Sequence, residues 1–205
     1  MVDHMSLPRF AVVDLETSGL DARRHRMLQI GMVITDAGGE VHDEWETFIK
    51  LKWPLGSVGP THIHGITRSM LRQAPRVNHV LDEFADRLGD SLFVAHNARF
   101  DGEFLARAAG HRNAPLGLAV SLQRRLCTLR MSRRLDPDRQ LSHRLGDVCE
   151  RYEVALDSPH EALADARATA SILPHLLHAH RVSSVEELTP FMDRPRTLRR
   201  RTRAS

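Results

Sequence analysis

The sequence contains few cysteines and few aromatic residues, and it has no long apolar run. Its two cysteines, Cys127 and Cys149, form no CxxC pair. This excludes a disulfide framework and a cysteine zinc site, and it suits a reducing compartment. Aromatic residues make up 5% of the chain, too few for an extended platform on which nucleic-acid bases stack. Because no stretch of about 18 apolar residues and no leader pattern occurs, we expect a cytoplasmic protein without a membrane span.

Lysine is also scarce, and the basic residues are almost all arginine. Of the 29 basic residues only Lys50 and Lys52 are lysines. Residues 194–205 hold six arginines and no acid, so subtracting them from the net charge of +3 leaves −3 for residues 1–193. A mildly acidic body with a basic tail is typical of a protein that handles phosphates, although an arginine-rich composition alone produces the same pattern.

The remaining composition predicts one globular α/β domain. The chain has 205 residues, of which 41% are apolar and 27% charged, enough for a hydrophobic core. Period-two and helical apolar patterns predict hairpin-linked strands followed by alternating strands and helices, with a hairpin turn at Gly38-Gly39. The expected strands are 9–16, 27–36, 40–50 and 91–96, and the expected helices are 77–88, 99–109, 141–153, 160–180 and 184–192. We divide the chain into an N-terminal extension (1–9), a domain (10–180) and a C-terminal segment (181–205) that contains a short helix and the basic tail.

Two carboxylates end the first expected strand, "FAVVDLETSG". Alternate residues of a strand project to the same face, so Asp14 and Glu16 stand side by side while Leu15 packs behind them. Two neighbouring anions repel each other unless a cation lies between them, and oxygen ligands suit Mg²⁺ or Mn²⁺. The alternative is a pair of solvated acids at an exposed turn.

Two further stretches carry acids next to predicted helix starts. In "FVAHNARFDGEFL", Asn97 is a candidate helix cap, and Asp101 falls in the first turns, directed toward the strand ends. In "SPHEALADARATASIL", Ser158, Glu161 and Pro159 predict a helix start that places His160 in the first turn. His160 and Asp165 then lie about 140° apart around an ideal helix, so we expect them not to bind one ion together. Asp101 alone is also explained as an acid at a helix N-terminus, and His160 alone as one of thirteen histidines that lies near an acid by chance.

Together the three stretches resemble the three motifs of the DEDDh branch of the DnaQ-like 3'–5' exonucleases. The resemblance covers about residues 10–177, and "THIHGIT" and "CTLRMSRRL" are similar to segments between the motifs. One departure is Ser18, where the first motif often has a threonine. The resemblance implies an RNase H-like fold, a mixed five-stranded sheet flanked by helices.

The resemblance also implies a two-metal mechanism with Mg²⁺ or Mn²⁺. Asp14, Glu16, Asp101 and Asp165 would hold the ions and His160 would accept the proton of the attacking water, releasing nucleoside 5'-monophosphates. Family analogy adds contacts for the terminal nucleotide. These are Leu15, Thr17, His64, Asn97 and Phe100. Histidines in such loops are more often structural, which applies to His62 and His64.

Several alternatives stay open at this level. We expect a single-stranded 3' end as partner and favour DNA over RNA; an exoribonuclease of the same family is the alternative. A DNA polymerase could be a partner, although a stand-alone repair or processing nuclease fits the short C-terminal segment better. A catalytically silent binding module or a structural calcium site is a further alternative. Six arginines within 121–139 could hold phosphates or form a solvated surface, and no apolar stripe declares an oligomer interface.

Overall fold

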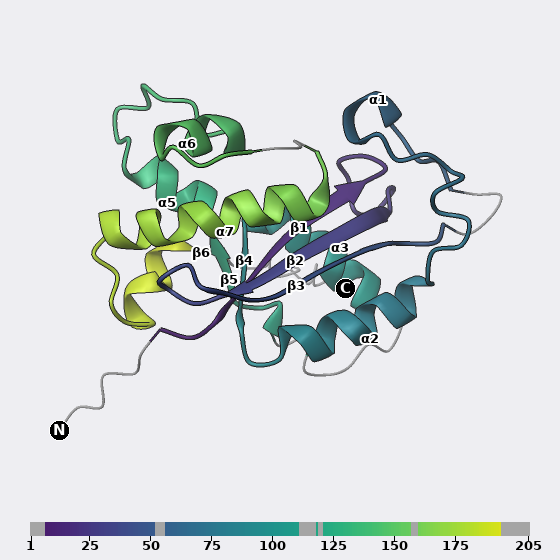
Figure 1. The fold of residues 1–205 in the computed structure, drawn as a ribbon, viewed down its shortest axis with the longest axis horizontal. Coiled ribbons are helices and arrows are strands. Elements are labelled where there is room, and N and C mark those ends of the chain that lie inside the picture. The colour runs from purple at the N-terminus through teal and green to yellow at the C-terminus, as the bar shows by residue number, and fades with distance from the viewer. Residues whose placement is uncertain (1–6, 52–55, 111–117, 119–120, 157–159, 194–205) are drawn as a thin grey trace, which may run out of the picture.

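A six-stranded mixed sheet forms the centre of the computed structural model, which describes residues 7–51, 56–110, 118, 121–156 and 160–193 (Figure 1). The strand order is β3-β2-β1-β4-β5-β6. β1 pairs with β2 antiparallel and with β4 parallel, so two of the strands that the site uses end at the same edge. The strands are β1 (Phe10–Thr17), β2 (Met27–Thr35), β3 (Val41–Phe48), β4 (Leu92–Ala95), β5 (Arg125–Cys127) and β6 (Met192–Asp193).

Helices cover both faces of the sheet. Figure 1 shows α7 on one side of the strands and α2 on the other. The helices are α1 (Thr61–His64), α2 (Val77–Leu88), α3 (Ala98–Gly110), α5 (Thr128–Arg134), α6 (Leu145–Arg151), α7 (Ala162–Ala179) and the short 3-10 helix η1 (Glu186–Phe191). None of the described helices combines the length and apolar character needed to cross a membrane.

The alternation of β1 divides the core into two layers. Ala11, Val13 and Leu15 pack into the layer that contains α2 and α3. Phe10 and Val12 face the other layer, with α6, α7 and η1. Because side chains alternate along a strand, residues 14 and 16 continue the face of residues 10 and 12. The two acids of β1 therefore lie on the α7 side of the sheet.

A glycine in β2 sets how closely α7 approaches this face. Gly31 is the pairing partner of Asp14, so both lie on the same face of the sheet. A Cβ atom at Gly31 would lie 2.4 Å from the backbone of Ala162 and Leu163, the first two residues of α7. The absence of a side chain thus allows the start of α7 to rest directly on the sheet beside Asp14.

Most of the expected elements are confirmed, with differences at their ends. The α2 bounds match the prediction, and a turn at Gly38-Gly39 joins β2 to β3. The strand predicted to include His96 ends at Ala95, and α6 and α7 are shorter than predicted. The mixed sheet has a sixth, two-residue strand, because β6 pairs with β5. The basic tail from residue 194 on lies outside the described residues.

Candidate metal and nuclease site

Asp14 and Glu16 stand at the carboxyl end of β1, on the face that α7 covers. Glu16 is 9% exposed, and Asp14 is partly exposed. Leu15 between them is buried in the opposite core layer. Seven residues of β1, from Phe10 to Glu16, pair with β2 in unbroken register, so the strand holds both carboxylates in a defined orientation. The expected side-by-side arrangement is confirmed.

The third stretch differs from its prediction at the helix start. α7 begins at Ala162 with Glu161 as its N-cap, so His160 lies before the helix rather than in its first turn. His160 has a left-handed backbone conformation (φ 69°), and its N–H donates to the Asp165 carboxylate at 3.3 Å. Ser158 and Pro159, the other residues of the expected capping box, lie outside the described residues.

This geometry overturns the expectation that His160 and Asp165 could not share an ion. One ligand atom each of Glu16, His160 and Asp165 lie within 4.8 Å of one another. The prediction of a 140° separation assumed that both residues belong to one regular helix. Because the chain turns before the helix starts, the imidazole folds back toward the carboxylate instead.

Asp101 reaches the same site from α3, which follows β4. It is 2% exposed, and its charge is among the largest influences on Asp14. One carboxylate oxygen of Asp101 and one of Asp165 are buried without a hydrogen-bond partner among the described residues. Buried acceptors without partners are costly, and a cation bound between the carboxylates would supply what they lack.

All four carboxylates have a raised pKa. Burial, followed by the charge of Asp165, raises the pKa of Glu16 to about 7. Burial raises the pKa of Asp101 to about 8, although N–H groups near its carboxylate oppose the shift. Burial and then the charges of Asp101, Asp165 and Glu16 raise the pKa of Asp14 well above its ordinary range. Burial also raises the pKa of Asp165, against the effects of His160.

This concentration of buried negative charge is stable with all groups ionised only when a positive charge joins it. The oxygen-rich ligand set, with one exposed imidazole beside it, suits a hard divalent cation better than a soft one. The site is therefore a candidate metal centre, formed by residues from β1, α3 and the start of α7.

The five predicted nucleotide contacts differ in how accessible they are. Leu15 is 5% exposed, and Thr17 is 8% exposed with its hydroxyl donating to the Gly19 carbonyl. Asn97 is exposed in a left-handed turn (φ 82°) rather than in the extended conformation of an N-cap. Phe100 is half-buried, with its ring 5.0 Å from that of Phe104. Asn97 and Phe100 thus present the most surface.

His64 holds a loop together beside the site. Its Nδ1 accepts from the Ile66 N–H at 3.0 Å, so Nε2 carries the proton donated to the Val58 carbonyl, also at 3.0 Å. The same loop contacts the end of β1, because a Cβ atom at Gly59 would lie 2.3 Å from the Ser18 carbonyl oxygen. His64 thereby positions the loop, with both ring nitrogens already hydrogen-bonded.

Three residues around the site were not expected from the sequence. Leu20 follows the carboxylate strand closely and is 87% exposed, an unusual position for a large apolar side chain. Gly31 lets α7 approach the carboxylates; an isolated glycine in an otherwise apolar strand was the available signal. Cys149 of α6 is buried close enough to Asp165 for that charge to add to the effect of burial, which together raise the thiol pKa to about 11.

Comparisons with known proteins show what the chain as a whole is similar to. A family model described as "Exonuclease" matches residues 11–173. The chain is 37% identical over 164 residues to the PolC-type DNA polymerase III of Halalkalibacterium halodurans, matching 80% of this chain but only 11% of that polymerase.

Two solved structures are similar in fold. E. coli Exonuclease I in complex with a dT13 oligonucleotide has a TM-score of 0.70 at 18% identity, covering 83% of this chain and 41% of that one. The nuclease domain of 3'hExo, a DEDDh family member bound to rAMP, has a TM-score of 0.71 at 14% identity, covering 84% and 93%. At these identities the likeness concerns the fold alone.

Proposed function

This chain belongs to the exonuclease family, and from that premise we propose that it removes nucleotides from nucleic-acid 3' ends by metal-dependent phosphodiester hydrolysis. The observation that carries the proposal is the convergence of three separate stretches of sequence on one site. β1, α3 and the start of α7 contribute four carboxylates with raised pKa values, and two of their buried oxygens lack partners among the described residues.

The carboxylates of Asp14, Glu16, Asp101 and Asp165 would hold two Mg²⁺ or Mn²⁺ ions; the charges of the other three acids all act on Asp14. When bound, such ions promote attack by water and stabilise the leaving oxygen. The positive charge of bound cations would offset the repulsion among the four carboxylates, so all four would stay ionised at neutral pH. The buried strand end and the first turn of α7 hold these ligands on rigid elements, as a precise site requires.

His160 is the candidate general base. It is exposed, so its ring can accept a proton from water at the site, and histidine is suited to proton transfer near neutral pH. Glu16 and Asp165 close to the ring would stabilise the imidazolium that forms. The hydrogen bond from the His160 N–H to Asp165 holds the residue at this position before the helix.

Exposed and half-buried side chains near the site would bind the terminal nucleotide. Phe100 and Asn97 follow β4, and Leu20 follows β1, so all three flank the carboxyl edge of the sheet. An exposed apolar or aromatic side chain supplies a surface for an unpaired base. Leu15 and Thr17 would contribute through the small part of their surface that remains accessible, and His64 through the loop that it holds.

We favour DNA over RNA as the substrate. The support is the 37% identity to a DNA polymerase III, a much higher similarity than to either solved structure. An exoribonuclease is the alternative. Time courses on equimolar single-stranded DNA and RNA of one sequence decide between them by the ratio of initial rates.

The proposal is tested with a 5'-labelled oligonucleotide. We expect a ladder that shortens from the 3' end in Mg²⁺ or Mn²⁺, no shortening with EDTA, and protection when the 3' hydroxyl is blocked. Asp14→Ala should abolish shortening, whereas Asp86→Ala should not, because Asp86 is an exposed acid of α2 on the far face of the sheet. Shortening that survives EDTA or Asp14→Ala would refute the assignment.

A further inference from the structure

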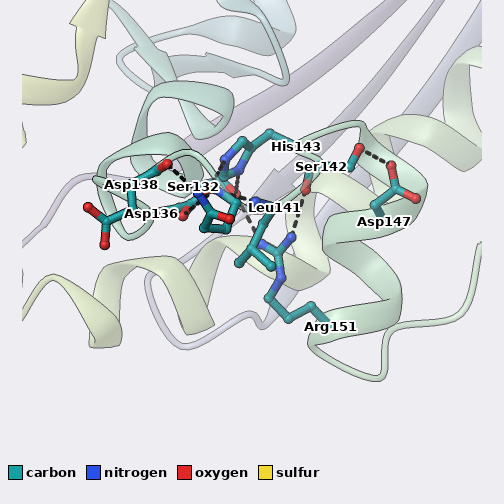
Figure 2. Close-up of polar contacts among 9 residues, drawn as sticks. Ser132, Asp136, Asp138, Leu141, Ser142, His143, Asp147 and Arg151 are labelled. Carbon is teal, nitrogen blue, oxygen red and sulfur yellow. Dashed lines mark hydrogen bonds and ion pairs between the residues drawn. The ribbon is translucent and has the colours of Figure 1, made fainter.

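A polar network links residues of α5, of the α5–α6 connection and of α6 (Figure 2). Its centre is His143, whose Nδ1 lies 2.8 Å from Ser132 Oγ and whose Nε2 lies 3.1 Å from Asp136 Oδ2. Asp136 also accepts from the N–H groups of Gln140 and Leu141, at 3.0 and 2.9 Å. The carboxylate therefore closes the loop on itself.

The order Ser132–His143–Asp136 is that of a hydrolase triad, but it has a different role here. Ser132 is 1% exposed, so its hydroxyl cannot reach a substrate carbonyl. Arg151 of α6 adds hydrogen bonds to Ser132 Oγ at 3.4 Å and to the Ser142 carbonyl at 2.7 Å. We call these four residues, Ser132, Asp136, His143 and Arg151, the brace, because their hydrogen bonds fix the connection between α5 and α6.

The brace is attached to the turn that follows β4. His96 Nε2 donates to the His143 carbonyl at 2.9 Å, and His96 Nδ1 lies 3.0 Å from the Thr128 hydroxyl. His96 directly follows Ala95, the last residue of β4, and lies five residues before Asp101. On the other side, α6 packs on α7 with Cys149 close to Asp165. The braced segment therefore borders the carboxylates.

Two arginines extend from this segment into solvent. Arg133 follows Ser132, and Arg144 follows His143, so each is next to a residue of the brace. Both are exposed, and neither forms an ion pair with any residue that the structure describes. The positive charge of Arg133 acts on His96, which places it beside the same turn.

Three of the other arginines of the sequence cluster have partners within the protein. Arg125 is 2% exposed beneath Gly102, which excludes it from a solvent-facing phosphate site. Arg130 interacts with Asp193 at 3.8 Å and with the Pro190 carbonyl. Arg134 lies over the Phe191 ring at 5.7 Å. The acids near the two exposed arginines already accept other hydrogen bonds: Asp147 accepts from the Ser142 hydroxyl, and Asp136 accepts from the Leu141 N–H.

We propose that Arg133 and Arg144 form a phosphate clamp that holds the single strand upstream of the scissile bond. This rests on the proposed function, which brings a polyanionic strand to the adjacent carboxylates. The rim of a carboxylate site repels phosphates, so fixed positive charges beside it are needed to retain a strand of several nucleotides. Guanidinium groups suit this task, because they pair with phosphate oxygens in a bidentate manner.

Salt dependence of binding tests the clamp directly. The probe is a fluorescently labelled oligothymidylate of 12 nucleotides, and the anisotropy titration runs in EDTA so that hydrolysis cannot interfere. Each single-strand phosphate contact contributes about 0.7 to the slope of log K against log salt. We expect the double variant Arg133→Gln/Arg144→Gln to lower that slope by roughly 1.4.

Arg107→Gln is the matched control, since Arg107 is an exposed arginine in the last turn of α3, at the end of the helix away from Asp101. It should keep the wild-type slope. The clamp is refuted if the double variant also keeps that slope, or if Arg107→Gln lowers it equally, which would indicate a nonspecific effect of charge.

Hydrolysis separates this proposal from the proposed function. The p-nitrophenyl ester of thymidine 5'-monophosphate has a phosphodiester but no upstream strand. In the double variant, kcat/KM for the 12-mer should fall more than kcat/KM for the ester; equal losses would contradict the clamp. A wild-type protein that cleaves neither substrate would refute the proposed function, whereas the binding slope still decides the clamp.

Discussion

Gly31→Ala is the substitution whose effect on the site follows most directly from the structure. The new methyl group would lie 2.4 Å from the backbone of Ala162 and Leu163, where ordinary contacts begin at 3.4 Å. The atoms in the way belong to the backbone and cannot rotate aside. The start of α7 must therefore move away from the sheet by roughly 1 Å, which is large for a catalytic site.

This movement carries Asp165 and His160 away from Asp14 and Glu16. Asp165 lies in the first turn of α7, and Gly31 is paired with Asp14, so the shift widens the space between the ligands themselves. A displacement of this size costs on the order of 10²-fold in rate. Overpacking the core is expected to cost about 1–3 kcal/mol in the free energy of unfolding.

The assay compares kcat on a labelled oligonucleotide with the thermal unfolding midpoint of the same preparation. Gly146→Ala in α6 is the matched control: its added methyl meets only a Leu156 side-chain carbon at 3.9 Å, an ordinary contact. We expect this control to retain kcat and to gain up to about 1 kcal/mol of stability, as alanine favours helices. Manganese affinity supplies a second readout, and it should weaken in Gly31→Ala alone.

Two results would refute the reasoning. A folded Gly31→Ala protein with wild-type kcat and manganese affinity would show that α7 need not approach the sheet so closely. A loss of activity equal to the unfolded fraction at the assay temperature would show an effect on stability without displacement of the ligands.

Three further predictions concern the charges of the site. Because burial and Asp165 raise the pKa of Glu16 to about 7 from an ordinary 4.5, the folded protein holds a proton that the unfolded chain releases. The metal-free protein should therefore lose about 3 kcal/mol of unfolding free energy as pH rises from 4.5 to 7. When that free energy is measured by urea unfolding at several pH values in this range, it should fall less steeply with pH for Glu16→Gln and for wild type with Mn²⁺. Asp14→Ala and Asp165→Ala should abolish hydrolysis while the metal-free variants melt at or above the wild-type temperature, since each change relieves repulsion; a markedly lower melting temperature would contradict this. His160→Ala should slow hydrolysis roughly 10²–10⁴-fold at neutral pH and alter the pH–rate profile, and an unchanged profile measured under single-turnover conditions would exclude His160 as the base.

The local sequence pattern was sufficient to predict the helices and strands that bury one face. The bounds of α2 follow from Val80, Leu81, Phe84 and Leu88, which recur at helical spacing and are all buried. The orientation of the acids in β1 follows from strand alternation, because a residue two positions along a strand must share the same face. These features depend only on neighbours in the sequence.

Features that depend on how distant segments meet could not be read in this way. A helical wheel separated His160 from Asp165, whereas a left-handed residue before the helix brings them together. Arg125 looked like a solvent-facing charge, but β5 lies inside the sheet, beneath Gly102. The β5–β6 pairing joins residues more than 60 positions apart, and neither strand is long enough to show a period.

The sequence by itself determined which residues are acidic, that Asp14 and Glu16 share a face, and which helices have an apolar side, because these properties are local. Only the tertiary structure decided that Asp101 and Asp165 reach the same site and that Gly31 is the point where α7 rests on the sheet. The physical reason is that close packing of backbone on backbone, and the burial that raises the carboxylate pKa values, arise only when segments far apart in the chain are brought into contact.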